Sequence, residues 1–304
     1  MKFTFKKDGA VSFSGKIGGV SVSGSAQLVW NGEGWQITFY APPKPKAKPP
    51  FVGWCETFPV KLTMDEQNIV TKVELGGEEP EMVQLWEGGP YWATRNIGAE
   101  KPEDYGYYFW WGDTVGYTRS GGTWNDYGNG DGSGYYSEVT WVSSTGAQMS
   151  TSPFLSSSCP TYNKDNSELL SAGYIDSTGN LTAAHDAAQV HLGGSWRMPT
   201  HQEQQDLIDK CDWIWTTQNN VNGYIVRGRG DYDTNSIFLP CAGYGDGTSL
   251  LYSGSHGYYW SSVPYSDNNY YSWRLYFSSS YHRTNGYYRR DFGFSVRPVQ
   301  SPAE

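Results

Sequence analysis

The chain has 304 residues, a formal net charge of -9, 16% aromatic residues and only 17% charged residues. This length fits two domains, or one large domain with a small one, and the negative charge argues against nucleic-acid binding because no basic surface would meet the phosphates. The 37 Gly, 24 Tyr and 14 Trp residues argue against a helical bundle and against disorder, and they favour strands, turns and ordered loops.

The N-terminal sequence MKFTFKKDGAVSFSGKIGG contains no apolar run of the length found in signal peptides. No stretch of the chain approaches the roughly 18 apolar residues of a membrane helix. We therefore expect synthesis in the cytoplasm without Sec export, and no insertion into a membrane.

Residues 1–41 have the pattern of a small antiparallel β domain. Apolar or small residues from Val20 to Trp30 alternate with Ser21, Ser23, Ser25 and Gln27, which is the two-residue period of a half-buried strand. The sequences DG at 8–9 and NGEG at 31–34 are turn signals, and Trp35, Ile37 and Phe39 continue the alternation. Such a sheet is near the minimum for independent stability, so we expect it to serve attachment or oligomerisation.

The sequence APPKPKAKPP at 41–50 marks the clearest domain boundary, and we assign 42–50 to a stiff, extended Pro/Lys spacer. Residues 51–81 contain strand-like runs such as PVKLTM and are assigned to a β connector. The main domain is expected over 82–300.

Two helices are expected in the main domain, near 182–192 and 200–211. Thr200 and Glu203 have the spacing of a capping box, and Leu207, Ile208 and Cys211 form an apolar stripe. Residues 119–165 are rich in Gly, Ser and Asn and are expected to be a long loop insertion.

No catalytic motif or metal-ligand spacing is present, so we expect no enzyme activity, no cofactor and no metal site. The five His residues lack a ligand spacing, and the four Cys residues, Cys55, Cys159, Cys211 and Cys241, lie far apart. Buried free thiols are the main expectation for these cysteines, and one disulfide is the alternative. The loop NDYGNGDGSG at 125–134 leaves calcium binding open as an alternative to a plain loop, because it carries Asp126, Asn129 and Asp131.

Five motifs follow one another along the main domain: EPEMVQLWEGGPYWATRNIGAEKPEDYGYYFWWGDT (79–114), LTAAHDAAQVHLGGSWRMPTHQEQQDLIDKCDWIWTTQNNVNGY (181–224), NSIFLPCAGYGDGTSL (235–250), GYYWSS (257–262) and FGFSVRPV (292–299). In this order they resemble the major paralogous domain of gut-bacterial and phage proteins. Its fold is similar to the formylglycine-generating-enzyme branch of the C-type lectin folds.

The resemblance implies an α+β, C-type-lectin-like domain over roughly 79–300. It implies scaffold roles for the tryptophans and for two arginines, Arg197 and Arg297, which we expect to form ion pairs or to bind carbonyls. The tryptophans expected in or beside the core are Trp92, Trp110, Trp196, Trp213, Trp215 and Trp260. The enzymatic relatives of this fold use a cysteine pair, and the nearest candidates here, Cys211 and Cys241, lie in motifs that indicate packing.

The segment SDNNYYSWRLYFSSSYHRTNGYYRRD at 266–291 has an unusual composition, with 18 of its 26 residues being Tyr, Ser, Arg or Asn. A subset of the resembled family is diversified by retroelements that mutate adenines, and the residue types that result are those that dominate here. The resemblance thus implies a variable region over about 258–299. The composition independently indicates a binding surface, because Tyr gives rigid contact area, Ser and Asn give adaptable hydrogen bonds, and Arg pairs with carboxylates.

Strand alternation predicts that Trp273, Leu275 and Phe277 point inward and that Arg274, Tyr276 and Ser278 point outward. Tyr270 is expected at the same surface as the candidate ligand-binding residues. Those candidates are Asn268, Asn269, Tyr271, Arg274, Tyr276, Ser278, Tyr281, His282, Asn285, Tyr287, Tyr288, Arg290 and Asp291.

The expected function is that of a ligand-binding display protein, of the kind found as receptor-binding proteins in phage tails. Its partners would be a host surface protein or glycan and the phage tail components, its location the virion, and its assembly, by resemblance, a homotrimer. The alternatives are a surface adhesin of a gut bacterium and an oxidase of the formylglycine-generating type.

Overall fold

The computed structural model describes six strands within residues 2–75 by their backbone, and residues 81–129 and 133–302 with their side chains. The chain divides into two compact units, one covering Met1–Glu79 with Val190–Gly194 and the other covering Pro80–Gln189 and Ser195–Glu304.

The first unit is a six-stranded antiparallel sheet in which each strand pairs with the next one along the chain. Its strands are β1 (Lys2–Phe5), β2 (Ala10–Ile17), β3 (Val20–Trp30), β4 (Trp35–Tyr40), β5 (Pro59–Met64) and β6 (Val70–Leu75). The strands predicted from the alternation at 20–30 and 35–39 are thus present as β3 and β4.

Two strands of the segment that we assigned to a connector extend this same sheet. β5 pairs with β4 along its whole length, from Trp35 opposite Met64 to Tyr40 opposite Pro59, and β6 pairs with β5. The expected turns at 8–9 and 31–34, the Pro/Lys spacer at 42–50 and Cys55 lie outside the described residues.

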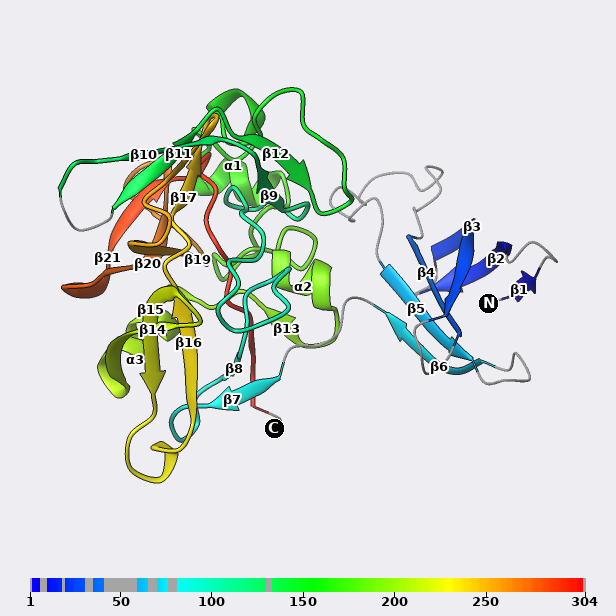
Figure 1. Ribbon diagram of the computed structural model, residues 1–304, viewed down its shortest axis with the longest axis horizontal. Helices are drawn as coiled ribbons and strands as arrows, with labels where there is room; N and C mark the ends of the chain where they lie inside the picture. The colour runs from blue at the N-terminus through cyan, green and yellow to red at the C-terminus, as the bar shows by residue number, and fades with distance from the viewer. Residues whose placement is uncertain are drawn as a thin grey trace. The chain divides into compact units, whose positions relative to one another are not determined.

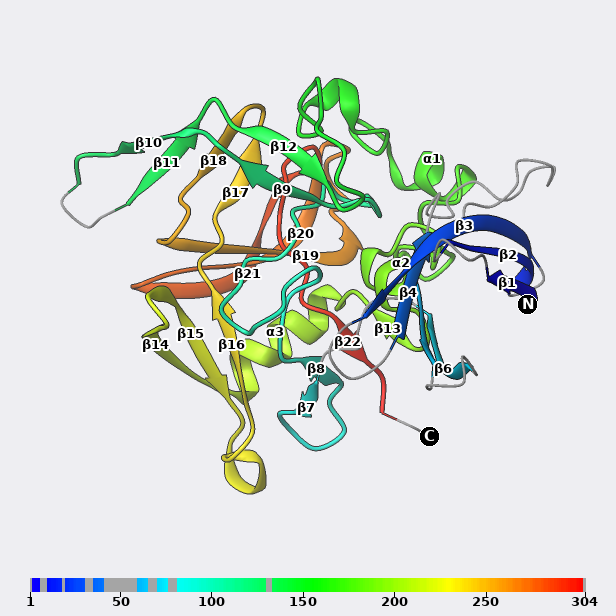
Figure 2. The same ribbon diagram turned by 45° about the vertical axis from the view of Figure 1, so that its right-hand side comes forward.

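The second unit is an α+β structure rich in small sheets, as Figures 1 and 2 show. Its sheets have the strand orders β10-β11-β18-β17, β12-β9, β13-β22-β8-β7, β14-β15-β16 and β19-β20-β21. The strands are β7 (Met82–Gln84), β8 (Tyr91–Ala93), β9 (Tyr117–Ser120), β10 (Thr123–Asp126), β11 (Gly134–Ser137), β12 (Thr140–Ser143), β13 (Trp196–Arg197), β14 (Asp212–Gln218), β15 (Val221–Arg227), β16 (Ser236–Pro240), β17 (Tyr244–Asp246), β18 (Ser249–Leu251), β19 (His256–Pro264), β20 (Tyr271–Ser278), β21 (Tyr281–Arg289) and β22 (Val299–Gln300). The helices are α1 (Asn166–Ser171), α2 (Ala187–Leu192) and α3 (His201–Lys210), with short 3-10 turns at η1 (Ser156–Ser158) and η2 (Gly230–Tyr232).

The expectation of a long loop over 119–165 is wrong. This segment contains β10, β11 and β12 together with the end of β9, and β11 also pairs with β18, which comes more than 100 residues later. The Gly-Gly pair at 121–122 forms the turn between β9 and β10, and both glycines have positive φ, of 66° and 95°. The glycine pair therefore belongs to a tight turn here, while Tyr and Trp occur in the short strands on either side.

The two expected helices exist, with one boundary misplaced. Thr200 caps α3 as predicted: its side chain accepts a hydrogen bond from the N–H of Glu203, whose carboxylate accepts from the N–H of Thr200. The expected start of α2 at 182 is wrong, because the carboxylate of Asp186 accepts from the N–H groups of Ala188 and Gln189 and so caps a helix that begins at Ala187.

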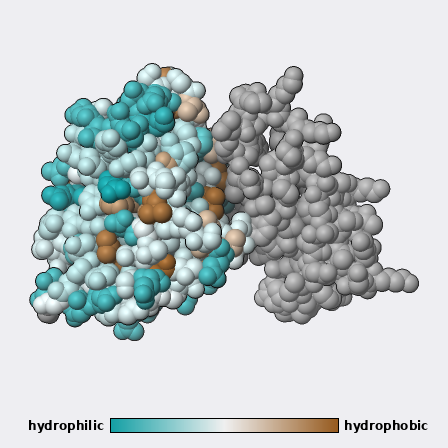
Figure 3. All heavy atoms as spheres, turned by 90° about the horizontal axis from the view of Figure 1, so that it is seen from above, coloured by the Kyte–Doolittle hydropathy of each residue, from teal (hydrophilic) through white to brown (hydrophobic). Residues whose placement is uncertain are grey.

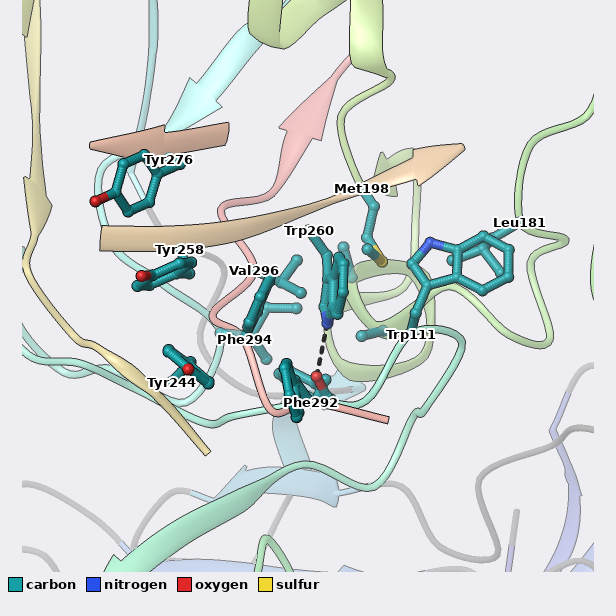
Figure 4. Packing of buried hydrophobic residues seen from close by; sticks show 14 of the residues in the cluster. Trp111, Leu181, Met198, Tyr244, Tyr258, Trp260, Tyr276, Phe292, Phe294 and Val296 are labelled. Carbon is teal, nitrogen blue, oxygen red and sulfur yellow. Dashed lines mark hydrogen bonds between the residues drawn. The ribbon is translucent and has the colours of Figure 1, made fainter. Parts of the chain in front are cut away.

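The aromatic scaffold agrees with the sequence analysis. Trp92, Trp196 and Trp260 are buried, and Trp110, Trp213 and Trp215 are half-buried. Most buried apolar side chains fall into two large clusters, one of which is shown in Figure 4 around Trp111, Trp260 and Phe294.

Both expected arginine scaffold roles are also confirmed. Arg297 donates to the carbonyls of Ala93 and Phe238 and to Asn96 at 2.8–3.0 Å, and Arg197 forms two hydrogen bonds with Glu203 at 2.6 and 2.7 Å.

On the face shown in Figure 3, the hydrophobic residues of the second unit form small separate groups among hydrophilic ones. No helix within the described residues is long and apolar enough to span a lipid bilayer.

Candidate tyrosine-rich binding surface

The expected variable region forms the sheet of β19, β20 and β21. β20 and β21 are joined by the two-residue turn Ser279–Ser280, so Ser278 lies opposite Tyr281. β20 is the central strand and β21 lies at the edge of the sheet. A helix, α3, packs against all three strands on one face.

A β-bulge interrupts the pairing of β20 with β21. Trp273 lies opposite Tyr287, but Arg274 lies opposite Asn285, so Gly286 is the extra residue on β21. The extra residue reverses the alternation beyond it. Tyr287 therefore joins Trp273 on the face toward α3, and Tyr288 points to the opposite face.

The face toward α3 carries a first aromatic group, which we call the Trp273 cluster: His201, Tyr265, Tyr271, Trp273 and Tyr287. Trp273 stacks on His201 of α3, with ring centroids 4.1 Å apart, and Tyr287 stacks on Tyr265 at the same distance. The ring centroid of Tyr271 lies 5.1 Å from that of Tyr287. Tyr287 is 43% exposed, so the outer part of this cluster faces solvent.

The opposite face carries a second group, the tyrosine cluster: Tyr244, Tyr258, Tyr276, Tyr281 and Tyr288. Neighbouring rings have centroids 4.8 to 5.8 Å apart, and the hydroxyl of Tyr281 donates to that of Tyr276 at 3.2 Å. Figure 4 shows Tyr244, Tyr258 and Tyr276 in a row beside Phe294 and Trp260. Tyr252 and His256 extend the group at the end of β18 and the start of β19.

Arg274 lies among the rings of the tyrosine cluster. Its guanidinium carbon is 4.6 Å from the centroid of the Tyr276 ring, 5.3 Å from that of Tyr288 and 5.5 Å from that of Tyr258. The side chain is only 4% exposed, and burial lowers its pKa to about 10, so it remains charged at neutral pH. Arg283 of β21 is exposed and lies over the outer rings, Tyr276 and Tyr281.

Arg290 anchors the end of β21 to the interior. It is fully buried, and it donates to the carbonyls of Tyr271, Thr161 and Lys164 and to the hydroxyl of Ser272 at 2.7 to 3.1 Å. The buried carboxylate of Asp291 pairs with Arg289 at 2.6 Å. Arg290 and Asp291 therefore hold the end of the β20–β21 hairpin in place through buried contacts.

The predicted site residues fall into three groups by exposure. Exposed residues are Tyr270, Tyr281, Asn285 and Tyr287, and half-buried residues are Asn268, Asn269, Tyr271, His282 and Tyr288. The prediction of an exposed position is wrong for Arg274, Tyr276, Ser278, Arg290 and Asp291, which are all buried.

For Arg274, Tyr276 and Ser278 the physical reason is that both faces of β20 are covered, whereas Arg290 and Asp291 follow β21 and make the buried contacts described above. Leu275 and Phe277 do point into the core beneath α3, as predicted, whereas Trp273 is half-buried on that face. On the other face, Arg274 and Tyr276 meet Tyr258 and Tyr288 instead of solvent, and they belong to a layer that also contains Phe292 and Phe294. Alternation along one strand cannot reveal this second layer.

Seven residues in or beside the two clusters were missing from the predicted site: His201, Tyr244, Tyr252, His256, Tyr258, Tyr265 and Arg283. Arg283 lies inside the unusual segment 266–291, so its composition was a usable signal. Tyr244 and Tyr252 lie before the expected variable region, and they reach it only because β17 and β18 fold back beside β19.

Within the described residues, no group of three or more His, Cys, Asp or Glu side chains could hold a metal ion. In the loop considered for calcium, Asp126 accepts a hydrogen bond from the N–H of Gly128, and Asp131 lies outside the described residues. Cys159, Cys211 and Cys241 are buried and free, as expected. Burial raises the pKa of the Cys159 and Cys211 thiols to about 12, and it also raises that of Cys241.

A family model described as a domain of unknown function (DUF8237) matches residues 199–299. The matched segment begins just before α3 and ends at β22, so it contains the β19–β21 sheet and the helix that supports it. No curated protein and no solved structure matches the chain.

Proposed function

We propose that this protein is a ligand-binding display protein of C-type-lectin-like fold, and that it acts as a phage tail receptor-binding protein. The β20–β21 hairpin and the rings beside it bind a molecule on the host surface, and the N-terminal sheet attaches the protein to the tail or holds it in a trimer. Retroelement mutagenesis diversifies the binding residues over about 258–299.

The observation that supports this proposal is the contrast between the outer and inner side chains of β21. Tyr281, Arg283, Asn285 and Tyr287 are exposed on an edge strand, whereas the strand ends at the buried clamp of Arg290. Exposed Tyr and Arg on a rigid base are the side chains that most often carry binding energy at protein interfaces. This arrangement can tolerate exchange of the outer residues while the base keeps its structure.

The state of the thiols supports binding over oxidase chemistry. A catalytic cysteine needs an accessible thiolate, but Cys211 and Cys241 are at most 1% exposed and burial raises the pKa of both. Arg229 and Lys210 lie near Cys211, but burial outweighs their charges and keeps the pKa of that thiol raised.

The proposal is tested by binding of the purified protein to host cells. Tyr281 and Tyr287 are replaced together by Ala, and Ile214→Ala serves as the matched control because Ile214 is also exposed, at 39%, but lies on β14. We expect the double variant to lose cell binding and the control to keep it, with both proteins keeping the far-UV circular dichroism and the cooperative thermal unfolding of the wild type. Unchanged binding of the folded double variant would refute the proposal.

Diversification is tested by genome sequence. We expect a near-copy of the DNA for 258–299, differing at adenines, beside a reverse transcriptase gene. A genome without the near-copy and without the reverse transcriptase gene would exclude retroelement diversification. The proposed binding of a host molecule would then be tested by the cell assay alone.

A further inference from the structure

Three arginines of the second unit are almost completely buried, and they differ in what they meet. Arg290 and Arg297 each donate to at least two backbone carbonyls and one side-chain oxygen. Arg274 makes no hydrogen bond to any described residue, and its Nε and Nη1 atoms are buried without a partner. Its surroundings are the faces of tyrosine rings.

A buried charge without a counter-charge is unfavourable, and attraction to ring faces offsets only part of that cost. No ion pair between described residues includes Arg274 or Arg283, whereas Arg197, Arg227, Arg229 and Arg289 all pair with carboxylates. The tyrosine cluster therefore has one arginine inside it and one at its rim, and neither is neutralised.

The position of Arg274 is set by the bulge on β21. A Cβ atom added to Gly286 would lie 3.0 Å from Nη2 of Arg274, so the glycine leaves the space that the guanidinium occupies. Because it lies in a medium of low dielectric, the charge of Arg274 is screened less than that of a surface arginine. The rings around Tyr276 therefore lie beside two arginines that form no ion pair with a described residue, although the whole chain is negative.

We propose that the tyrosine cluster binds an acidic segment of a partner protein, with Arg283 pairing directly with a Glu or Asp carboxylate and Arg274 attracting it from beneath the rings. This inference rests on the proposed function and names the ligand class of the same surface. A protein partner fits better than a glycan because phenol rings and arginine together are the side chains enriched at protein interfaces.

The test is a fluorescence titration of the full chain with a short polyglutamate peptide, at low and high ionic strength. Polyglutamine of equal length is the uncharged control, and oligogalacturonate supplies carboxylates on a sugar. Of these three ligands, we expect only polyglutamate to bind, and we expect high ionic strength to weaken its binding. We expect Arg283→Ala to weaken it by about tenfold or more, since hydrogen bonds to charged groups are the strong ones. Arg227→Ala is the matched control, because Arg227 is an exposed arginine that already pairs with Asp212.

Arg274→Met gives a second, independent readout. We expect it to weaken polyglutamate binding like Arg283→Ala while leaving the melting temperature of the free protein unchanged or higher, because an unpaired buried charge is replaced by an apolar chain of similar length. Arg274→Lys, which keeps the charge, should retain part of the binding even if the Met variant fails to fold.

Three results would overturn the inference: no binding of polyglutamate, equal binding of polyglutamine, or binding that neither Arg283→Ala nor Arg274→Met alters. Binding of oligogalacturonate alone would assign the surface to an acidic glycan and also overturn it. The two proposals can fail separately. If the Tyr281 and Tyr287 variant loses cell binding but the wild type does not bind polyglutamate, the result contradicts this inference and leaves the proposed function standing. Cell binding that does not depend on those tyrosines contradicts the proposed function, and with it this inference.

Discussion

Nη1 of Arg290 donates a hydrogen bond of 2.7 Å to the carbonyl of Lys164, a residue 126 positions earlier in the chain. This contact joins the end of β21 to the turn that precedes α1. The same nitrogen also reaches the carbonyl of Thr161 at 3.0 Å, so one side chain connects two distant segments beneath the candidate binding surface.

Arg290→Lys should destabilise the protein substantially. Lysine has one ammonium group in place of the planar guanidinium, so it cannot reach the carbonyls of Tyr271, Thr161 and Lys164 together. We expect the free energy of unfolding in urea to fall by about 3 kcal/mol. The exposed Arg227→Lys should change it by less than about 0.5 kcal/mol, and equal effects of the two changes would contradict the clamp.

Two buried carboxyls predict that part of the stability is lost as the pH rises. Burial raises the pKa of Asp113 from 3.8 to about 7 and that of Asp186 to about 6. At a pH between 3.8 and the raised pKa, the folded protein binds more protons than the unfolded chain. These two carboxyls therefore make folding less favourable as the pH rises from about 4 to about 7. The loss of stability is up to about 1.4 kcal/mol per pH unit for each proton.

The contribution of Asp113 is isolated by comparison with Asp113→Asn. The difference in free energy of unfolding between wild type and variant, measured in urea from about pH 4 to about pH 8, should move in the variant's favour up to about pH 7 and then level off. A flat difference for Asp113→Asn would show that its carboxyl titrates normally.

The three described cysteines should be unreactive in the folded protein. The thiols of Cys159, Cys211 and Cys241 are at most 4% exposed, and burial raises the pKa of each. With iodoacetamide at about pH 8, peptide mapping should find these residues unmodified under native conditions and fully modified in guanidinium. Rapid labelling of Cys211 or Cys241 in the folded protein would contradict this prediction and would favour the oxidase alternative.

Thr200→Ala should weaken the start of α3, which supports the β19–β21 sheet. Its hydroxyl accepts a hydrogen bond of 3.2 Å from the N–H of Glu203, and loss of such a cap costs about 1 kcal/mol. Thr200→Ser keeps the hydroxyl and should restore most of the lost stability in urea unfolding. If the Ala and Ser variants unfold alike, the cap contributes nothing.

Local sequence signals predicted the elements whose cause is itself local. The capping box at Thr200 and Glu203 located α3 to within one residue, and the alternation from Val20 located β3. The same kind of signal was present but unused at α1, where Asp165 and Glu168 form a second capping box. Within 119–165, β11 also pairs with the distant β18, which local pattern cannot reveal, whereas β10 and β12 pair with nearby strands and were missed because Gly, Ser and Asn dominate the segment.

The candidate site was predicted by composition more accurately than by geometry. The segment rich in Tyr, Ser, Asn and Arg forms one hairpin, on which Tyr281 and Tyr287 are exposed as predicted. It did not separate the exposed Arg283 from Arg274 and Arg290, which are buried, because that difference depends on rings contributed by β17 and β19 and on carbonyls of Thr161 and Lys164. Residue type indicates what a side chain can bind, whereas tertiary packing decides whether a ligand can reach it.

The extra residue at Gly286 decides which residues of β21 share a face with Arg274: Tyr288, opposite Ser272, lies on that face, and Tyr287, opposite Trp273, lies on the other. Tyr287 and Tyr288 are neighbours in the chain, yet they point to opposite faces of the hairpin. Changes at two adjacent codons therefore alter two physically separate surfaces, one beside α3 and one around Arg274. A library randomised at position 287 alone would explore the first surface without disturbing the charged centre of the second.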